Sequence, residues 1–255
     1  MKKLNLIILI GLMILSCSSD DENTSNTGDN PDLTTKLLKK VTVSNPNQTY
    51  SINFYYNSEN LIDKLEYLDT GSGFIEQYFY VNDELTKIER QDLNGIFQGR
   101  KEEYTYENGL PTERRDFINT STLDEVFKYS YTSNLLSNIQ YFGFNETEFS
   151  EQDIFQYNSN QNVISITTDY VNNSIVDTRT DYTYDTKNSP FENVEPKITL
   201  IEGVVSFNNN PVTEEKIDLT TNNVIDSKDY SYTYDSEDYP LTQTDGNETL
   251  TFEYY

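Results

Sequence analysis

The chain has 255 residues, with 43 acidic and 18 basic side chains, one cysteine, no histidine and a formal net charge of −25. A chain this acidic is repelled by nucleic acids and by anionic lipid headgroups, so we expect neither as a direct partner. The lack of histidine excludes Ser-His-Asp and Cys-His catalysis and histidine-ligated metal sites.

Residues 1–16 have the organisation of a secretory signal. Lys2 and Lys3 form a basic start, and the apolar run 4–15 that follows is too short for an ordinary membrane span. The run ends in the letters ILSC, which resemble the lipoprotein signal of bacteria. The resemblance implies that residues 1–16 are removed and that Cys17 carries the lipid that attaches the protein to a membrane. The alternative is a plain signal peptide followed by an incidental cysteine.

Residues 17–32 are predicted to be a disordered acidic tether. After the cysteine this segment contains no apolar side chain, so it has nothing to bury. Its start, SSDDE (18–22), resembles the acidic export signal of Bacteroidota lipoproteins. That resemblance implies the outer face of the outer membrane; the alternative is a spacer that faces the periplasm.

An aromatic pair with one residue between its members recurs through the rest of the chain. Up to Tyr184 the second members are 24 to 27 residues apart, and the next interval, to Tyr234, is 50 residues. We interpret these side chains as the repeat core: Phe54, Tyr56, Tyr78, Tyr80, Tyr104, Tyr106, Tyr129, Tyr131, Phe155, Tyr157, Tyr182, Tyr184, Tyr232 and Tyr234. A further pair, Phe252 and Tyr254, begins a final half-unit.

Each pair is followed by a turn-forming cluster and then by a second apolar run, as in ENG (107–109) or VISITTDY (163–170). Within the runs, polar and apolar residues alternate with a period of two, which indicates strands with one wet and one buried face. The sequence therefore predicts an all-β fold, an antiparallel meander of seven to eight hairpins and about fourteen to sixteen strands. The first hairpin pairs 37–43 with 50–56. Without helices to cover the aromatic face, the sheet has to curl into a barrel-like, spiral or open-shell form.

The units carry a resemblance to a known repeat. YTYD (182–185 and 232–235), a polar turn and a following apolar residue resemble the YD or RHS-type repeat, and the whole of 33–255 is similar to Bacteroidota surface lipoproteins of uncharacterised function. The glycine-arginine-leucine that commonly follows YD is absent, and seven or eight units are too few for the cargo shell of the large toxins. The resemblance implies one β-repeat domain and a cell-surface location.

The segment 185–229 interrupts the period. Prolines stand at 190, 196 and 211, and three asparagines at 208–210 mark a loop. We expect one degenerate or remodelled unit there. Two interpretations fit this pattern equally well: an inserted loop that carries the function, or a decayed or capping repeat.

Few residues suggest chemistry. Asp92 and Asn94, or the acidic and amide residues of 29–32, offer oxygen ligands for calcium, but a polar turn is favoured because the further ligands of an EF-hand are missing. The out-of-phase Tyr55, Phe79 and Tyr67 are the candidates for an exposed, sugar-stacking face.

We therefore expect no catalytic residues, no metal and no cofactor. The predicted function is a non-catalytic, outer-membrane-anchored lipoprotein whose repeat surface binds a glycan or a surface protein, or has a structural role. The alternative is a hydrolase of surface polysaccharide that uses two carboxylates, which leave no local signature in a sequence.

Overall fold

The computed structural model describes residues 35–144, 146–171, 175–200 and 207–255, so the signal, Cys17 and the tether lie outside the described residues. Within these described ranges, one short 3-10 helix, η1 (Lys197–Thr199), accompanies seventeen strands. The strands are β1 (Leu38–Ser44), β2 (Thr49–Tyr56), β3 (Ile62–Asp69), β4 (Ser72–Val81), β5 (Glu84–Gln91), β6 (Phe97–Glu107), β7 (Leu110–Ile118), β8 (Thr122–Thr132), β9 (Leu135–Gly143), β10 (Phe149–Tyr157), β11 (Val163–Tyr170), β12 (Thr178–Tyr184), β13 (Pro211–Asp218), β14 (Val224–Asp229), β15 (Ser231–Tyr234), β16 (Pro240–Thr244) and β17 (Thr249–Tyr254).

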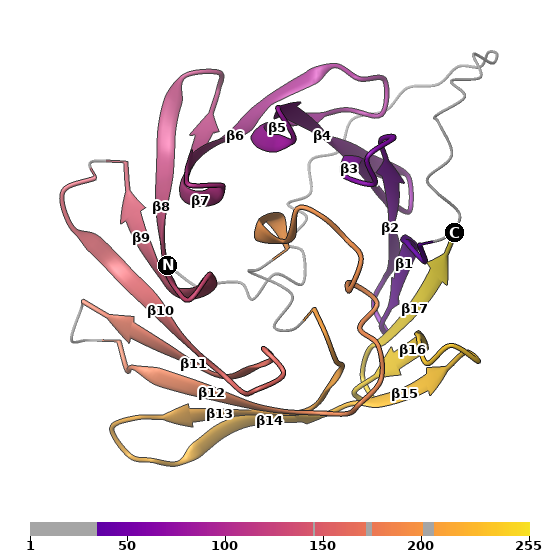
Figure 1. Ribbon diagram of the computed structural model, residues 1–255, viewed down its shortest axis with the longest axis vertical. Helices are drawn as coiled ribbons and strands as arrows, with labels where there is room; N and C mark the ends of the chain where they lie inside the picture. The colour runs from indigo at the N-terminus through magenta and orange to yellow at the C-terminus, as the bar shows by residue number, and fades with distance from the viewer. Residues whose placement is uncertain (1–34, 145, 172–174, 201–206) are drawn as a thin grey trace.

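The strands form one antiparallel meander that is nearly closed into a barrel-like sheet (Figure 1). β1 pairs with β2 and also with β17, so the two ends of the meander meet. The single step without a ladder is from β14 to β15, which adjoin along the chain through Tyr230 and pair with β13 and β16 respectively. The predicted all-β fold is confirmed, as is the first hairpin, in which Val43 lies opposite Tyr50.

A β-bulge recurs at the same place in seven hairpins. Tyr55 lies opposite Lys64, but the next residue, Tyr56, lies opposite Ile62, so the register slips by one residue. The same slip occurs at the second aromatic residue of the other units up to β15–β16. Turn residues with positive φ, such as Asn60 and Asn108, precede these bulges. Bulges increase local twist and bend, which helps a single sheet to curl.

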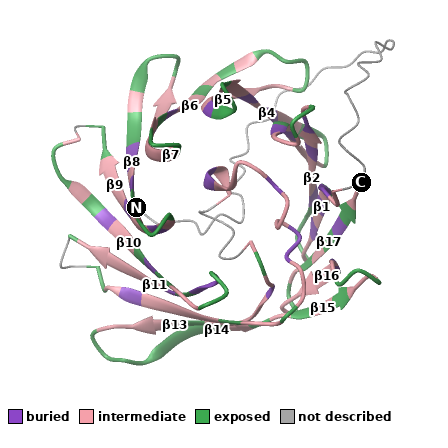
Figure 2. Cartoon of the chain, viewed as in Figure 1, coloured by how far each residue is buried: buried purple, intermediate pink, exposed green. Residues whose placement is uncertain are grey.

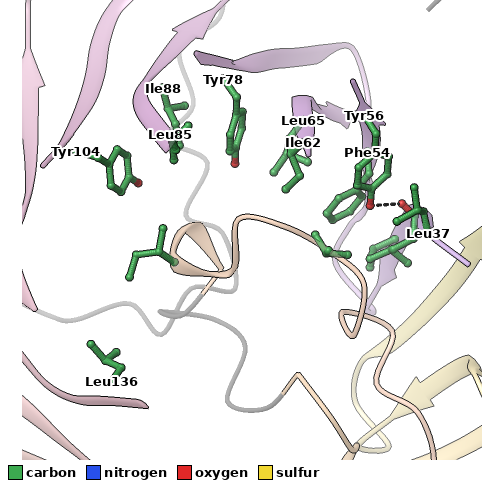
Figure 3. Close-up of a cluster of buried hydrophobic side chains, with 14 of the residues drawn as sticks. Leu37, Phe54, Tyr56, Ile62, Leu65, Tyr78, Leu85, Ile88, Tyr104 and Leu136 are labelled. Atoms are coloured by element: carbon green, nitrogen blue, oxygen red, sulfur yellow. Dashed lines mark hydrogen bonds between the residues drawn. The ribbon is translucent and has the colours of Figure 1, made fainter. Parts of the chain in front are cut away.

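The labelled aromatic side chains of the stripe point into the ring (Figure 3), and buried residues lie on the strands around it (Figure 2). Phe54 from β2, Tyr78 from β4 and Tyr104 from β6 are buried together with aliphatic residues of the intervening strands, among them Leu65 and Leu85. Burying large aromatic surfaces, at about 25 cal/mol per Å², stabilises the closed sheet from within.

Of the two forms expected for the unit in 185–229, degenerate or remodelled, the structure shows the remodelled one. β13 is followed by β14 and β15, and this continuous run ends in the ordinary pair Tyr232 and Tyr234, so no hairpin is missing. The extra length lies in the connection before β13, which runs from 185 to 210, whereas the corresponding connection before β11 runs only from 158 to 162. This insertion turns into the ring, where η1 lies (Figure 1).

The insertion closes at its base and fills part of the lumen. Asp185 N–H donates to the Asn210 carbonyl at 3.0 Å, so the chain leaves and re-enters the sheet at one point. Inside, Val194 is fully buried, and the Glu195 carbonyl accepts a 2.8 Å hydrogen bond from the amide of Ile62. The sheet thus covers its aromatic face both by curling and by enclosing its own chain. No helix in the described ranges is long and apolar enough to cross a membrane.

Candidate functional site

The fourteen residues predicted as repeat core all lie on the inward-facing side of even-numbered strands or of β15. The first members of the first five pairs are buried, as are Tyr56 and its neighbours in the core cluster. Tyr80, Tyr106, Tyr131, Tyr157 and Tyr182 are partly buried and pack against that cluster, whereas Tyr184, Tyr232 and Tyr234 are partly buried outside it. These side chains make up one layer of the lumen, here called the aromatic layer.

Several tyrosines of the pairs are fixed by their hydroxyl groups. They reach across to the backbone at the start of an adjacent strand: Tyr56 donates to the Leu38 carbonyl at 2.7 Å, and Tyr80 to the Ile62 carbonyl at 2.6 Å. The same contact is made by the second members Tyr157 to Leu136, Tyr184 to Val163 and Tyr254 to Pro240, and by the first member Tyr232 to Pro211. Tyr234 donates instead to the carboxylate of Asp185, and Tyr131 has no partner for its hydroxyl among the described residues. The aromatic layer is therefore mainly structural, because most of these hydroxyl groups are used within the domain.

A second layer of the lumen is polar. In a strand, the residue two positions before an inward-facing tyrosine also faces inward. This places Glu76 on β4 and Glu102 on β6 inside the ring. Together with Arg90 on β5 and Asp116 on β7 they line a recess of about 170 Å³. Its outer lining includes Arg100, Ile118, Asp124 and Glu125. We call this feature, between β4 and β8, the polar recess.

Glu76 is the most perturbed acid of the polar recess. It accepts a 3.0 Å hydrogen bond from the hydroxyl of Tyr67, which in turn stacks on Phe74 with ring centroids 4.4 Å apart. Burial, and after it the charge of Glu102, raises the pKa of Glu76 to about 7. A carboxyl group in this state exchanges protons near neutral pH.

Glu102 is held more firmly by its neighbours. It accepts a 2.6 Å hydrogen bond from Tyr104 and lies 4.0 Å from the guanidinium of Arg114. Arg114 forms two hydrogen bonds with Asp116, at 2.9 and 3.1 Å, and stacks over Phe127 at 3.7 Å. Charge-assisted bidentate pairs of this kind fix the orientation of both groups.

Arg90 differs from Arg114 in what surrounds it. It stacks over Phe74 at 3.6 Å, yet it forms no ion pair with any of the described residues. Burial lowers the pKa of Arg90; the charge of Glu76, which lies opposite it on β4, raises the pKa, and the charge of Arg100 lowers it. The polar recess therefore contains one guanidinium that is packed like Arg114 and faces a carboxyl group, but lacks the bidentate pairing of Arg114.

The other residues singled out in the sequence have structural roles or lie outside the described residues. Asp92 accepts hydrogen bonds from the amides of Asn94 and Ile96, as in a polar turn, and the described ranges hold no cluster of metal-ligating side chains. Tyr55 and Phe79 are partly exposed on the outer face, where Lys64 and Lys87 lie over their rings. The expectation of an exposed Tyr67 is wrong, since it packs against the core and reaches Glu76.

The polar recess was missed because its residues form no motif. A signal did exist: Glu76 and Glu102 stand two residues before Tyr78 and Tyr104, in phase with side chains interpreted as core. Charged residues at core-phase positions are costly to bury unless they are paired or functional.

No known family profile matches the sequence, and no curated protein matches it. Two crystal structures of porin-like proteins resemble the fold. One is from Bacteroides uniformis ATCC 8492, with 12% identity, a TM-score of 0.58 and coverage of 86% of this chain and 98% of that chain. The other is from Bacteroides vulgatus ATCC 8482, with 13% identity, a TM-score of 0.59 and coverage of 87% and 99%.

The Tc holotoxin pore of Photorhabdus luminescens matches with 12% identity and a TM-score of 0.33, over 78% of this chain and 12% of that chain, which is too low to indicate a shared fold. The likeness to the two porin-like proteins shows a common fold and assigns no family. Membership of a YD/RHS-type group of lipoproteins stays a prediction.

Proposed function

We propose that this chain is a non-catalytic, lipid-anchored protein of the outer membrane, and that its barrel-like domain binds a polar ligand in the polar recess. The observation that carries the proposal is the concentration of Glu76, Arg90, Glu102 and Asp116 in one recess of a lumen whose other layer is aromatic. Small-molecule sites are concave and combine apolar walls with a few converging polar groups.

The charged side chains on the outer face of the sheet favour a domain that is surrounded by water beside the membrane. Ion pairs between residues two apart project outward from several strands, among them Lys87 with Glu89 at 2.7 Å and Arg179 with Asp181 at 2.8 Å. A sheet facing hydrocarbon needs apolar side chains there, because a charged side chain at the bilayer midplane costs about 2–4 kcal/mol. The anchor in this proposal is a lipid on Cys17, joined to the domain by the acidic tether.

The insertion supports retention of a ligand rather than its passage. Asn193 donates to the carbonyl of Lys36 at 3.1 Å and to the hydroxyl of Tyr239, which itself donates to Glu192 at 2.7 Å. The segment inside the ring is thereby tied both to the beginning of the domain and to its last hairpin. A lumen crossed by a fixed segment is suited to a site that opens at one end.

A glycan array probed with the full chain in detergent tests the proposal. We expect binding to a restricted set of saccharides and loss of that binding on Glu102→Gln, with Glu89→Gln, whose partner Lys87 lies outside the recess lining, as the control. No binding across a broad panel of glycans would count against the proposal. A Cys17→Ser variant tests the anchor: it should leave the membrane fraction, and its retention there would contradict lipid attachment.

The second candidate is a carboxylate-based glycoside hydrolase. Glu76, with a pKa of about 7, has the character of a general acid, and Glu102 is a second carboxylate in the same recess. We favour binding because Glu102 is engaged by Tyr104 and Arg114. Release of reducing sugar by the unmodified chain, abolished in Glu76→Gln, would favour the hydrolase.

A further inference from the structure

Two arginines lie next to each other on β5 and β6. Glu89 on β5 pairs with Lys101 on β6, so the next residue of each strand, Arg90 and Arg100, are neighbours just before the register slips. Both line the polar recess. Like charges opposite each other on neighbouring strands destabilise a sheet. The charge of Arg100 lowers the pKa of the Arg90 guanidinium, whereas Glu76, opposite Arg90 on β4, raises it.

Arg114 shows what a completed site in this lumen contains. Its guanidinium lies over Phe127 at 3.7 Å and binds Asp116 with two hydrogen bonds. Arg90 repeats the first half of this arrangement, over Phe74 at 3.6 Å, and faces Glu76 across β4 and β5 without the two hydrogen bonds that Arg114 forms. The other basic residue that lines the recess, Lys101, is paired with Glu103 at 2.5 Å. Neither Arg90 nor Arg100 has an ion-pair partner within the described part of the chain.

We infer that the polar recess binds an acidic sugar residue whose carboxylate lies between Arg90 and Arg100, an inference that rests on the proposed function. Guanidinium groups bind carboxylates through two parallel hydrogen bonds, and an anion placed here cancels the repulsion between the two arginines. Glu76 and Glu102 line the same recess and offer acceptors for sugar hydroxyls. At about 170 Å³ the recess is smaller than sites for drug-sized ligands, so it receives one ring at a chain end.

Calorimetric titration of the full chain in detergent with trigalacturonate, galactotriose and inorganic sulfate tests the inference. We expect trigalacturonate to bind at least ten times more tightly than the neutral trisaccharide, and binding to weaken as salt is added. Tighter binding of sulfate alone than of trigalacturonate would show a general oxyanion site and overturn the assignment to an acidic sugar.

Variants locate the anion. Arg90→Gln and Arg100→Gln should each weaken trigalacturonate binding at least tenfold, whereas Arg179→Gln, which removes an arginine from the outer face, should leave it unchanged. Arg100→Gln removes a repulsion, so its melting temperature should stay the same or rise, and its lost binding cannot be ascribed to unfolding. Arg90→Gln also removes the stacking on Phe74, so its melting temperature is measured beside its binding. Equal binding of trigalacturonate by Arg90→Gln and the unmodified chain would overturn the inference. If neutral saccharides bind in the recess and acidic ones do not, the inference fails while the proposed function stands; if none binds, both fail.

Discussion

The hydroxyl of Tyr56 reaches the carbonyl of Leu38 at 2.7 Å across β1 and β2. Leu38 in turn lies opposite Tyr254 on β17, so this contact sits where the two ends of the meander join. The residue opposite Tyr56 on its other side, Ile62, accepts the corresponding bond from Tyr80. The tyrosine contacts thus follow one another round the ring, and each links a strand to the strand before it.

The first prediction concerns this contact. Tyr56→Phe keeps the ring in place and removes the hydroxyl, which leaves a buried carbonyl short of a hydrogen bond, so we expect a loss of about 1–3 kcal/mol in the free energy of unfolding. Urea denaturation followed by circular dichroism measures it. The matched control is Tyr131→Phe, since the buried Tyr131 hydroxyl has no hydrogen-bond partner among the residues that the structure describes; its loss should change stability by less than about 0.5 kcal/mol. Equal losses in the two variants would contradict a stabilising role for the contact.

Much of the fold follows from the period of two and from the recurrence of aromatic pairs. Alternation along residues such as Tyr104 and Tyr106 specifies which face is buried, and a closed ring is the way for a single sheet to bury it without helices. The tyrosine-to-carbonyl contacts could not be predicted, because they depend on a one-residue slip of register that leaves no mark of its own in the sequence.

The insertion and the polar recess show where the period stops being informative. A doubled interval between Tyr184 and Tyr234 fits a decayed unit and an inserted segment equally well, since both add one period of chain. Only the pairing of Asp185 with Asn210 reveals an excursion into the lumen. Likewise, Arg90 and Arg100 are neighbours because Glu89 pairs with Lys101, a register between β5 and β6 that the sequence does not specify.

The second prediction tests how much the insertion stabilises the domain. Val194 is 0% exposed, so Val194→Ala removes two buried carbons and leaves a cavity, which we expect to lower the free energy of unfolding by about 2 kcal/mol. Val224→Ala on β14 makes the same chemical change at a side chain that is 53% exposed, and should stay within about 0.5 kcal/mol of the unmodified chain. A loss in Val194→Ala no larger than in this control would mean that the insertion is loosely held.

The third prediction concerns Gly73, which lies at the start of β4 beside the tight turn from β3. A Cβ at Gly73 would lie 2.5 Å from the Tyr67 carbonyl and 3.2 Å from side-chain atoms of Leu68 and Leu93, so Gly73→Ala forces the strands apart. We expect a loss of about 1–3 kcal/mol, the range for overpacking. Gly143→Ala is the control, because a Cβ there meets no atom within 4 Å. Thermal unfolding of both variants checks the difference; an unchanged melting temperature for Gly73→Ala would show that β3 and β4 can separate at little cost.

The fourth prediction uses the raised pKa of Glu76. An unfolded chain ionises this carboxyl near its ordinary value of 4.5, whereas the folded chain keeps the proton until about pH 7. The unfolded state therefore binds fewer protons between these values, and stability falls as pH rises through the window. At 1.36 kcal/mol per pKa unit the full effect is roughly 3 kcal/mol.

Glu76→Gln replaces the acid with a neutral group and should remove this loss. We expect the variant to match the unmodified chain near pH 5 and to be more stable by about 1–3 kcal/mol at pH 8, measured by urea denaturation at both values. Glu103→Gln, on the outer face, controls for a general effect of removing negative charge.

The charged and titratable groups that bear on Glu76 come from five strands: Tyr67, Tyr78, Arg90, Glu102 and Arg114. A bound anion between Arg90 and Arg100 makes the ionised form of Glu76 less favourable. Saturating trigalacturonate should therefore shift the pH range over which stability falls to higher pH. An unchanged pH range would mean that the bound sugar does not affect Glu76.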